Sequence, residues 1–279
     1  MNLLVDIGNT ACKAAFANGK TIGKIYHYVG EDIDDFIKKI IDKECPHVKP
    51  EIIVLSSVRN KDTLLEKELK KECGDLIVFD TDFVSSLISD NEFSTEKNDP
   101  IFVLSNMPEG MGSDRMAAIL ASHCLFPDKD LIVFDFGTAT TVEFINGRKD
   151  AGIFEESKTA EYLGGAISLG LNTRYKALNY FTQKIPLLNP NDFLKNNKIQ
   201  DISTIGTDID TALAAGNILG IMFEIQGYIA MHPDRTIIFT GGDAIYFAER
   251  LKNSIFVVYN LVLMGLSHIA QHYAQTKKH

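Results

Sequence analysis

The sequence repeats one short pattern at two points that lie far apart in the chain. Each copy is an apolar run that ends in Asp-x-Gly and a threonine, followed by a second apolar run and an Asn-Gly pair. The copies cover residues 3–19 and 131–147. This pattern predicts a strand, a tight glycine turn, a second strand and a hairpin turn. Because the copies are too far apart for a solenoid repeat, we expect two half-molecules of similar build that face each other across a cleft.

The two turns carry groups that suit a bound phosphate. The first turn holds Asp6 and Gly8, and the second holds Asp135 and Gly137. A glycine lets the backbone approach a phosphate with its N–H groups pointing at the anion, and a nearby carboxylate usually holds a cation that neutralises the charge. Two unrelated hairpins are the alternative, but the matched flanks argue against it. Lys13, on the returning strand, either reaches towards a ligand of the turn or is solvated, and its spacing does not decide between these.

The composition is that of a globular protein with an excess of acidic groups. Of 279 residues, 45% are hydrophobic and 23% are charged, and 37 acidic against 28 basic residues give a net charge of −9. Binding to nucleic acid requires basic surface, so we expect no nucleic-acid partner, whereas a small anion needs only a local site. With no run of about 18 apolar residues and no signal peptide, we also expect no membrane span. Four scattered cysteines indicate a reducing cytoplasm instead of a disulfide framework or structural zinc.

Periodicity along the chain indicates an α/β protein. Residues 1–79 are expected to form three strands, a helix, a strand, a helix and a strand, which gives a mixed sheet. Residues 85–99 read as a polar surface loop, and the glycine cluster 164–170 is expected to open a helix that runs to about residue 181. Residues 208–231 read as a long apolar helix whose glycines form a face for close packing. Gly241-Gly242 follows a predicted strand and precedes a helix, a position that suits an adenosine or a phosphate.

A third polar motif, Gly-Ser-Asp-Arg at 112–115, precedes a predicted helix over 116–125. Ser113 or Asp114 would cap the N-terminus of that helix in the simplest interpretation. Alternatively, Asp114 acts as a general base beside Arg115. The motif alone leaves both interpretations open.

These motifs occur in an order that resembles the phosphate-1, phosphate-2 and adenosine segments of the acetate and sugar kinase, Hsp70 and actin superfamily. Within it, Asp-Ile-Gly-Asn-Thr at 6–10, Gly-Ser-Asp-Arg at 112–115, Asp-Phe-Gly-Thr-Ala-Thr-Thr at 135–141 and Gly-Gly-Ala-Ile at 164–167 look like type III pantothenate kinase. The match runs over essentially the whole chain. The combination is specific, although each motif alone is not.

The resemblance implies an α/β protein of two ribonuclease H-like domains, with mixed sheets flanked by helices and the active site in the interdomain cleft. We expect the domains at residues 1–125 and 126–279. The implied reaction is the phosphorylation of pantothenate by ATP, the first step of coenzyme A biosynthesis. It implies Mg²⁺ with ATP, a monovalent cation (K⁺ or NH₄⁺) and a homodimer in the cytoplasm.

The resemblance also assigns roles to residues of this sequence. Asp114 would be the catalytic base, Asp135 the ligand of the monovalent cation, and Asp6 a magnesium contact. The ATP-binding residues would be Asp6, Ile7, Gly8, Asn9, Thr10, Ala11, Cys12, Lys13, Thr138, Gly241 and Gly242. The pantothenate-binding residues would be Gly112, Ser113, Asp114, Arg115 and Ile209.

The chain departs from the family pattern mainly on the acceptor side. Ser105 stands where the family usually has tyrosine, and Ile209 stands where it has a threonine that contacts pantothenate. The family's Pro-Gly reads Leu169-Gly170, and its Thr-x-Asp ends in Glu143. The resemblance as a whole predicts an ATP-dependent pantothenate kinase, and the acceptor-side departures leave two alternatives. One is a non-catalytic nucleotide-binding regulator, and the other is a kinase of the same superfamily with another small hydroxyl acceptor.

Overall fold

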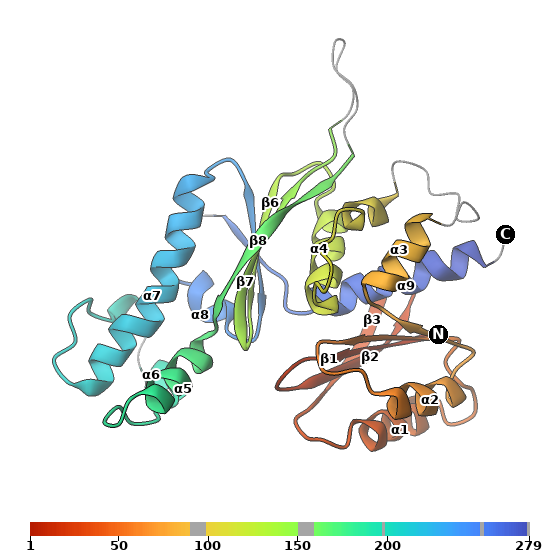
Figure 1. Cartoon of the computed structure of the whole chain (residues 1–279), viewed down its shortest axis with the longest axis horizontal. Coiled ribbons are helices and arrows are strands. Elements are labelled where there is room, and N and C mark those ends of the chain that lie inside the picture. Colours follow the sequence, from red (N-terminus) through yellow and green to blue (C-terminus); the bar gives the residue numbers. More distant parts are fainter. Residues whose placement is uncertain (90–98, 150–158, 197–198, 252–253, 278–279) are drawn as a thin grey trace, which may run out of the picture. The chain divides into compact units, whose positions relative to one another are not determined.

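The structure, a computed structural model, describes residues 1–89, 99–149, 159–196, 199–251 and 254–277. The chain divides into two compact units, each with one five-stranded sheet (Figure 1). Unit 1 comprises Met1–Asp128, Gly147–Tyr162 and Asn260–His279. Unit 2 comprises Lys129–Asn146 and Leu163–Tyr259.

Unit 1 has a mixed sheet with the strand order β3-β2-β1-β4-β5. Strand β1 is antiparallel to β2, which is antiparallel to β3, and β1, β4 and β5 run parallel. The strands are β1 (Asn2–Ile7), β2 (Cys12–Asn18), β3 (Thr21–Tyr28), β4 (Ile52–Ser57) and β5 (Asp75–Val78). The helices are α1 (Ile33–Glu44), α2 (Thr63–Lys71), α3 (Thr81–Ser89), η1 (Pro100–Leu104), α4 (Ser113–Leu125) and α9 (Leu261–Thr276).

Unit 2 has a sheet with the order β10-β9-β6-β7-β8. Strand β6 is antiparallel to β7 and parallel to β9, which is parallel to β10. The strands are β6 (Leu131–Phe136), β7 (Ala139–Asn146), β8 (Glu161–Leu169), β9 (Thr236–Gly241) and β10 (Ile255–Val257). The helices are α5 (Leu171–Phe181), α6 (Pro190–Asn196), η2 (Ile199–Asp201), α7 (Ile209–Met231) and α8 (Ala244–Ala248).

The two sheets have the same strand order when β6 is equated with β1. In both sheets a central hairpin, β1–β2 or β6–β7, is extended on one side by an edge strand and on the other by parallel strands. This is the expected ribonuclease H-like arrangement, and it confirms that the repeated sequence pattern marks two halves of similar build. Asp6 and Asp135 each occupy the next-to-last position of the first strand of their unit.

The sheet of unit 1 is covered on both faces, because consecutive residues of β1 point to opposite faces and Leu3 to Ile7 are all buried. Leu3, Val5 and Ile7 join the apolar cluster formed with α1 and α2. The residues between them point to the opposite face, against which α4 and α9 pack. Helices α4 and α9 cross closely, because a Cβ on Gly265 would lie 2.0 Å from the Ala117 carbonyl oxygen. The tight crossing explains the small residues along this face of α4.

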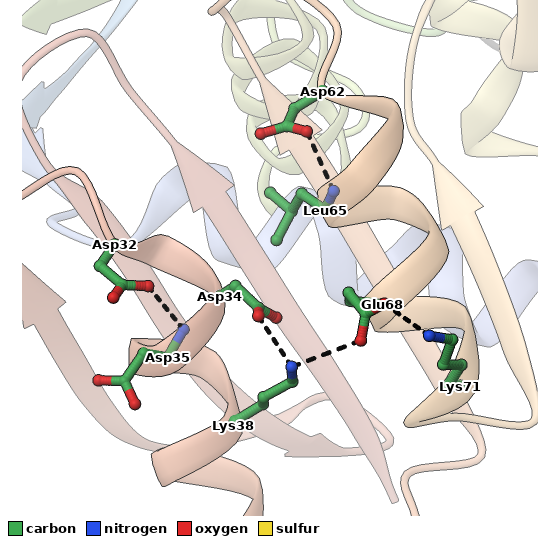
Figure 2. A network of polar contacts seen from close by, with 8 residues as sticks. All are labelled: Asp32, Asp34, Asp35, Lys38, Asp62, Leu65, Glu68 and Lys71. Atoms are coloured by element: carbon green, nitrogen blue, oxygen red, sulfur yellow. Dashed lines mark hydrogen bonds and ion pairs between the residues drawn. The ribbon is translucent and has the colours of Figure 1, made fainter.

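Helices α1 and α2 are fixed by their own carboxylates (Figure 2). Asp32 accepts a hydrogen bond from the Asp35 N–H at 3.1 Å, and Asp62 accepts one from the Leu65 N–H at 3.0 Å, so each helix has an aspartate N-cap. Lys38 on α1 contacts Asp34 at 2.8 Å and Glu68 on α2 at 3.5 Å. The N-termini of both helices therefore already carry negative charge, which disfavours an anion there.

The core of unit 2 is rich in aromatic side chains. Phe134 and Phe136 on β6 both pack edge-on against Phe239 of β9, with ring centroids 5.3 and 4.9 Å apart. Phe247 of α8 lies 4.9 Å from Phe136. Helices α5 and α7 add aliphatic side chains to the same cluster. Because Phe134 and Phe136 point into this core, Asp135 between them points to the other face of the sheet.

Two predictions of local structure were partly wrong. Of the glycine cluster 164–170, only Gly170 opens a helix, as the N-cap of α5, which ends at Phe181 as expected, whereas residues 161–169 form strand β8. Exposed residues alternate with less exposed ones along β8, which is the period of a strand and not of a helix. The expected loop 85–99 instead begins within helix α3, and its residues 90–98 lie outside the described part of the chain.

Two further expectations differ from the structure. The expected domains, 1–125 and 126–279, place the last helix in the second half, whereas α9 packs on β1 and β4 in unit 1. Helix α7 is long and apolar enough to cross a membrane by length and composition alone, which the sequence prediction did not recognise. Many of its apolar side chains, such as Leu219 and Met222, lie in the core of unit 2, and a buried core helix passes the same test.

Candidate nucleotide and acceptor sites

The turn between β1 and β2 forms as the sequence predicts. Asp6 pairs with Lys13 in the antiparallel register, so the two side chains lie on one face of the sheet, and Lys13 is half-buried. The Gly8 N–H donates to the Ala11 carbonyl oxygen at 2.9 Å and closes the turn. Asn9 and Thr10 at its tip are exposed.

Two expected ATP contacts point into the core with their side chains. Ile7 is 2% exposed and Cys12 is 1% exposed. Burial, and to a smaller extent the charge of Asp6, raises the pKa of the Cys12 thiol to about 12. These two residues can therefore offer a ligand only their backbone, and Cys12 stays a neutral thiol.

Arg59 is a contact of this turn that the sequence analysis did not find. Its Nε donates to the Gly8 carbonyl oxygen at 2.9 Å, and its Nη2 lies 3.4 Å from the Asn9 carbonyl oxygen. Arg59 lies just after β4, the strand that runs parallel to β1. The mostly polar stretch 56–61, which begins at the end of the buried strand, is the sequence signal that could have identified it.

A buried hydrogen-bonded chain connects the first turn with the start of α4. Ser56, which is 0% exposed, donates to Asp6 Oδ1 at 3.3 Å, and its Oγ lies 2.9 Å from Ser113 Oγ. Ser113 also donates to the Ser57 carbonyl oxygen at 3.3 Å. Unit 1 therefore holds the nucleotide motif and the Gly-Ser-Asp-Arg motif next to each other. Ser56 and Ser57 were not predicted to have this role.

The Gly-Ser-Asp-Arg motif starts α4 without a side-chain cap. Gly112 is the N-cap, and neither Ser113 nor Asp114 caps the helix, so the capping interpretation is wrong. A Cβ at Gly112 would lie 2.7 Å from Asp114 Oδ1, the oxygen that accepts a hydrogen bond from the Arg115 N–H at 2.7 Å. Glycine at position 112 thus leaves room for the Asp114 carboxylate. The Arg115 guanidinium lies 3.4 Å from the Tyr162 hydroxyl.

The turn between β6 and β7 is built on the same plan from different neighbours. The Gly137 N–H donates to the Ala139 carbonyl oxygen at 3.0 Å, two residues later, whereas the Gly8 N–H in unit 1 donates to a carbonyl three residues later. The Thr138 carbonyl oxygen accepts from the Gly170 N–H at 3.1 Å and from the Thr173 hydroxyl at 2.6 Å. A Cβ at Gly170 would lie 2.1 Å from the Gly137 carbonyl oxygen, so the N-terminus of α5 needs glycine there to reach the turn.

Asp135 lies beside the third glycine motif. It pairs with Thr240 across the parallel strands β6 and β9. Gly241 has a φ of +91°, and a Cβ there would lie 2.5 Å from Asp135 Oδ1. Gly242 is exposed, with nothing within 4 Å of a Cβ position. The phosphate-2 and adenosine motifs of the sequence are therefore adjacent in unit 2.

Asp243 follows these glycines at the start of α8. Its N–H donates to the Phe136 carbonyl oxygen at 3.3 Å, and burial raises the pKa of its carboxyl to about 6. Asp243 was not among the predicted site residues. Its position next to Gly242 is the signal that could have identified it.

The two acceptor-side departures lie at surface positions. Ile209 begins α7, is 48% exposed, and lines a pocket of about 650 Å³ with Tyr175, Phe193 and Asp210. Its neighbour Thr211 is engaged in a capping box with Asp208. Ser105 is exposed at the end of η1 and lines a pocket of about 240 Å³ with Leu104, Met107 and residues of α3. Neither side chain supplies what the tyrosine or the threonine of the family pattern would offer.

The predicted cation ligands do not form a multidentate protein site. Within the described ranges, no group of three or more His, Cys, Asp or Glu side chains is placed to hold a metal ion. Asp6 and Asp135 each offer a single carboxylate beside a phosphate-type turn. One protein carboxylate is the usual share for Mg²⁺ that arrives with a nucleotide, because the ion keeps phosphate and water oxygens. The donor set therefore fits a nucleotide-bound cation.

Comparison with known proteins identifies relatives over nearly the whole chain. The sequence model of the type III pantothenate kinase family matches residues 2–231. Type III pantothenate kinases of Christiangramia forsetii and Porphyromonas gingivalis are 33% and 32% identical, and each alignment covers 97% of this chain and 98% of the relative. The enzyme of Bacteroides fragilis is 31% identical over 96% of this chain and 97% of its own.

Solved structures show the same fold at lower sequence identity. A Campylobacter jejuni protein described as a Baf family transcriptional activator superposes with a TM-score of 0.58 at 19% identity, covering 98% of this chain and 99% of its own. A Sinorhizobium meliloti protein described as a 2-dehydro-3-deoxygalactonokinase superposes with a TM-score of 0.52 at 9% identity, covering 99% of both chains.

Proposed function

Because this chain belongs to the type III pantothenate kinase family, we propose that it is a pantothenate kinase in which Asp114 is the general base. It transfers the γ-phosphoryl group of ATP to the hydroxyl of pantothenate and produces 4′-phosphopantothenate, the first step of coenzyme A biosynthesis. The hydrogen-bonded chain from Asp6 through Ser56 to Ser113 carries the proposal. Within unit 1, it connects Asp6 of the first Asp-x-Gly turn with Ser113 of the Gly-Ser-Asp-Arg motif, which supports adjacent nucleotide and acceptor sites.

The proposed roles follow from the chemistry of phosphoryl transfer. The acceptor hydroxyl must lose its proton as its oxygen approaches the γ-phosphorus in line, and a positioned carboxylate can take that proton. Asp114 is half-buried at the start of a rigid helix, with Gly112 leaving room for its carboxylate. Backbone N–H groups at the two turns, other than those of Gly8 and Gly137, bind phosphate oxygens. In phosphoryl transfer, positioning and electrostatics supply most of the acceleration.

Asp6 would hold Mg²⁺ and Asp135 would hold K⁺ or NH₄⁺. Each cation offsets the negative charge of the triphosphate when bound. Ser56 donates to Asp6 and fixes one of its oxygens. Gly241 keeps space beside Asp135, since a Cβ there would press on Oδ1. Activity should therefore require magnesium and rise with potassium, while sodium at the same ionic strength serves as the control.

Coupled ADP release with pantothenate tests the proposed reaction. Asp114→Asn should lower kcat by about 100- to 10,000-fold, the range for a lost general base, and should leave the Kd of ATP within about threefold. Asp35→Asn is the matched control, because Asp35 also lies in the first turn of a helix, and its carboxylate pairs with the exposed Lys39. Pure, folded protein that binds ATP without pantothenate-dependent ADP release would favour a nucleotide-binding regulator. A screen of other small hydroxyl compounds as acceptors would then distinguish a nucleotide-binding regulator from a kinase that phosphorylates another substrate.

The chain is proposed to act as a homodimer in the cytoplasm. All four cysteines are free thiols, which suits a reducing compartment. Strand β8 is an edge strand of its sheet and exposes Leu163, Ile167 and Leu169 along one face, with exposed fractions of 48%, 64% and 49%. An apolar edge strand favours pairing with another chain. Ile167→Asp should give monomers in light scattering, whereas Val48→Asp, at an exposed valine of unit 1, should not.

A further inference from the structure

Arg59 contacts two backbone carbonyls of the turn between β1 and β2. Its Nε donates to the Gly8 carbonyl oxygen at 2.9 Å, and Nη2 lies 3.4 Å from that of Asn9. The guanidinium is planar and presents these donors in a fixed fork, so the two carbonyls are held on one side of the turn. The side chain is half-buried and also lines a pocket of about 390 Å³ with Ile7 and Ser57.

The contact between Arg59 and the two carbonyls fixes the direction of the neighbouring N–H groups. Across a trans peptide, the carbonyl of one residue points opposite to the N–H of the next. When the carbonyls of Gly8 and Asn9 face Arg59, the N–H groups of Asn9 and Thr10 face the other way. Successive N–H groups that point in one direction form a concave site for an anion. Arg59 therefore orients the two central donors of the turn through its contacts with the two carbonyls.

In unit 2, the carbonyl oxygen of the corresponding turn is bound by other residues. The Thr138 carbonyl oxygen accepts from the Gly170 N–H and the Thr173 hydroxyl, which turns the next N–H, that of Ala139, away from α5. In each unit, therefore, an adjacent element takes up the carbonyls of the phosphate-type turn. The device in unit 1 has a positive charge and that in unit 2 has none, so Arg59 also adds a favourable field near bound phosphate.

We propose that Arg59 is a positioning residue for ATP, holding the turn 8–11 in its phosphate-binding form and placing a positive charge behind it. This inference rests on the proposed use of the turn for ATP. It predicts that Arg59 controls the binding of nucleotide and not of the acceptor. If Arg59 were only a surface charge or only contributed to folding, its loss would not weaken ATP binding while leaving pantothenate binding unchanged.

The test compares Arg59→Met, Arg59→Lys and the control Lys67→Met, which removes a positive charge from the exposed face of α2. Calorimetry with ATP and magnesium gives the Kd, and coupled ADP release gives KM for each substrate. Arg59→Met should raise the Kd and KM of ATP about tenfold or more, because charged hydrogen bonds and a nearby charge are lost. KM for pantothenate should stay within about twofold. Arg59→Lys should remain impaired by about threefold or more, since an ammonium keeps the charge but cannot hold both carbonyls.

Three outcomes would overturn the inference. They are an unchanged ATP Kd in Arg59→Met, full recovery in Arg59→Lys, or an equal rise in both KM values. If Arg59→Met does not fold, the Kd of Arg59→Lys decides alone. If the wild-type protein binds ATP but does not phosphorylate pantothenate, pantothenate is refuted as the acceptor. The role of Arg59 is then still tested by comparing the Kd of ATP between the wild type and the variants. Wild-type protein with no affinity for ATP refutes both proposals.

Discussion

Substitution by alanine should have very different effects on the stability of unit 2 at the neighbouring glycines 241 and 242. Gly241 has a φ of +91°, and a Cβ there would lie 2.5 Å from both Asp135 Oδ1 and the Phe136 carbonyl oxygen. Gly242 has open space at its Cβ position and no unusual φ. Gly241→Ala should therefore damage the fold of unit 2, and Gly242→Ala should leave it intact.

The structure sets the size of the difference. A side chain in the left-handed region costs roughly 1–3 kcal/mol, and forced overlap in a packed site costs about 1–3 kcal/mol more. Because Phe136 is part of a central strand, its backbone cannot move away without disturbing the sheet. The free energy of unfolding should thus fall by about 2–6 kcal/mol in Gly241→Ala. In Gly242→Ala it should change by less than about 1 kcal/mol, with a small gain from the stiffer unfolded chain.

Urea unfolding followed by far-ultraviolet circular dichroism is the appropriate assay, since the chain has no tryptophan. ATP affinity adds the second half of the prediction. If the nucleotide lies against this segment, Gly242→Ala should weaken ATP binding in a protein of undiminished stability, because the new methyl group occupies the approach to the backbone. Equal stability of the two variants would refute the steric reasoning. Unchanged ATP affinity in Gly242→Ala would refute the assignment of Gly242 to the nucleotide site.

Three other predictions concern unit 1. Ser56→Ala should cost about 1–2 kcal/mol in urea unfolding and lower kcat, because the link to Asp6 is lost; unchanged kcat would refute a link to catalysis. Gly265→Ala should cost at least about 3 kcal/mol, because its methyl group would meet the Ala117 carbonyl; a cost below about 1 kcal/mol would contradict the close crossing. Burial, with a smaller effect of a nearby arginine, lowers the pKa of His123 from 6.5 to about 4, so the unfolded chain binds its proton first. The neutral His123 therefore contributes fully to the free energy of unfolding above pH 6.5, and this contribution is lost as the pH falls towards 4. His123→Leu should reduce the loss of stability between these pH values by about 2–3 kcal/mol. Parallel curves of stability against pH for the variant and the wild type would refute this prediction.

The central hairpins could be predicted because their information is local. Alternating or continuous apolar runs, Asp-x-Gly turns and Asn-Gly pairs act within about ten residues, and the strands β1, β2, β6 and β7 formed where expected. The glycine cluster 164–170 was misread for the converse reason. Glycine is compatible with several backbone conformations, so only pairing with β7, which the sequence does not display, makes this stretch a strand.

The supporting residues of the site were out of reach for a similar reason. Arg59 and Ser56 act on Gly8 and Asp6, about fifty residues earlier, because β4 pairs in parallel with β1. No spacing rule links a strand end to a distant turn until that pairing is known. The Gly-Ser-Asp-Arg motif could be located by resemblance, whereas the lack of a side-chain cap on its helix became clear only from the structure.

The placement of α9 has a consequence for biosynthesis. This segment, residues 261–276, packs on strands that begin at Asn2 and Ile52, so the first half of the chain lacks one wall of its core until residues 261–276 have left the ribosome. Unit 2, which ends at Tyr259, is synthesised completely before that point. Nascent chains halted before residue 260 should therefore expose an apolar sheet face of the N-terminal half to chaperones, while the later-made half is already protected from proteolysis.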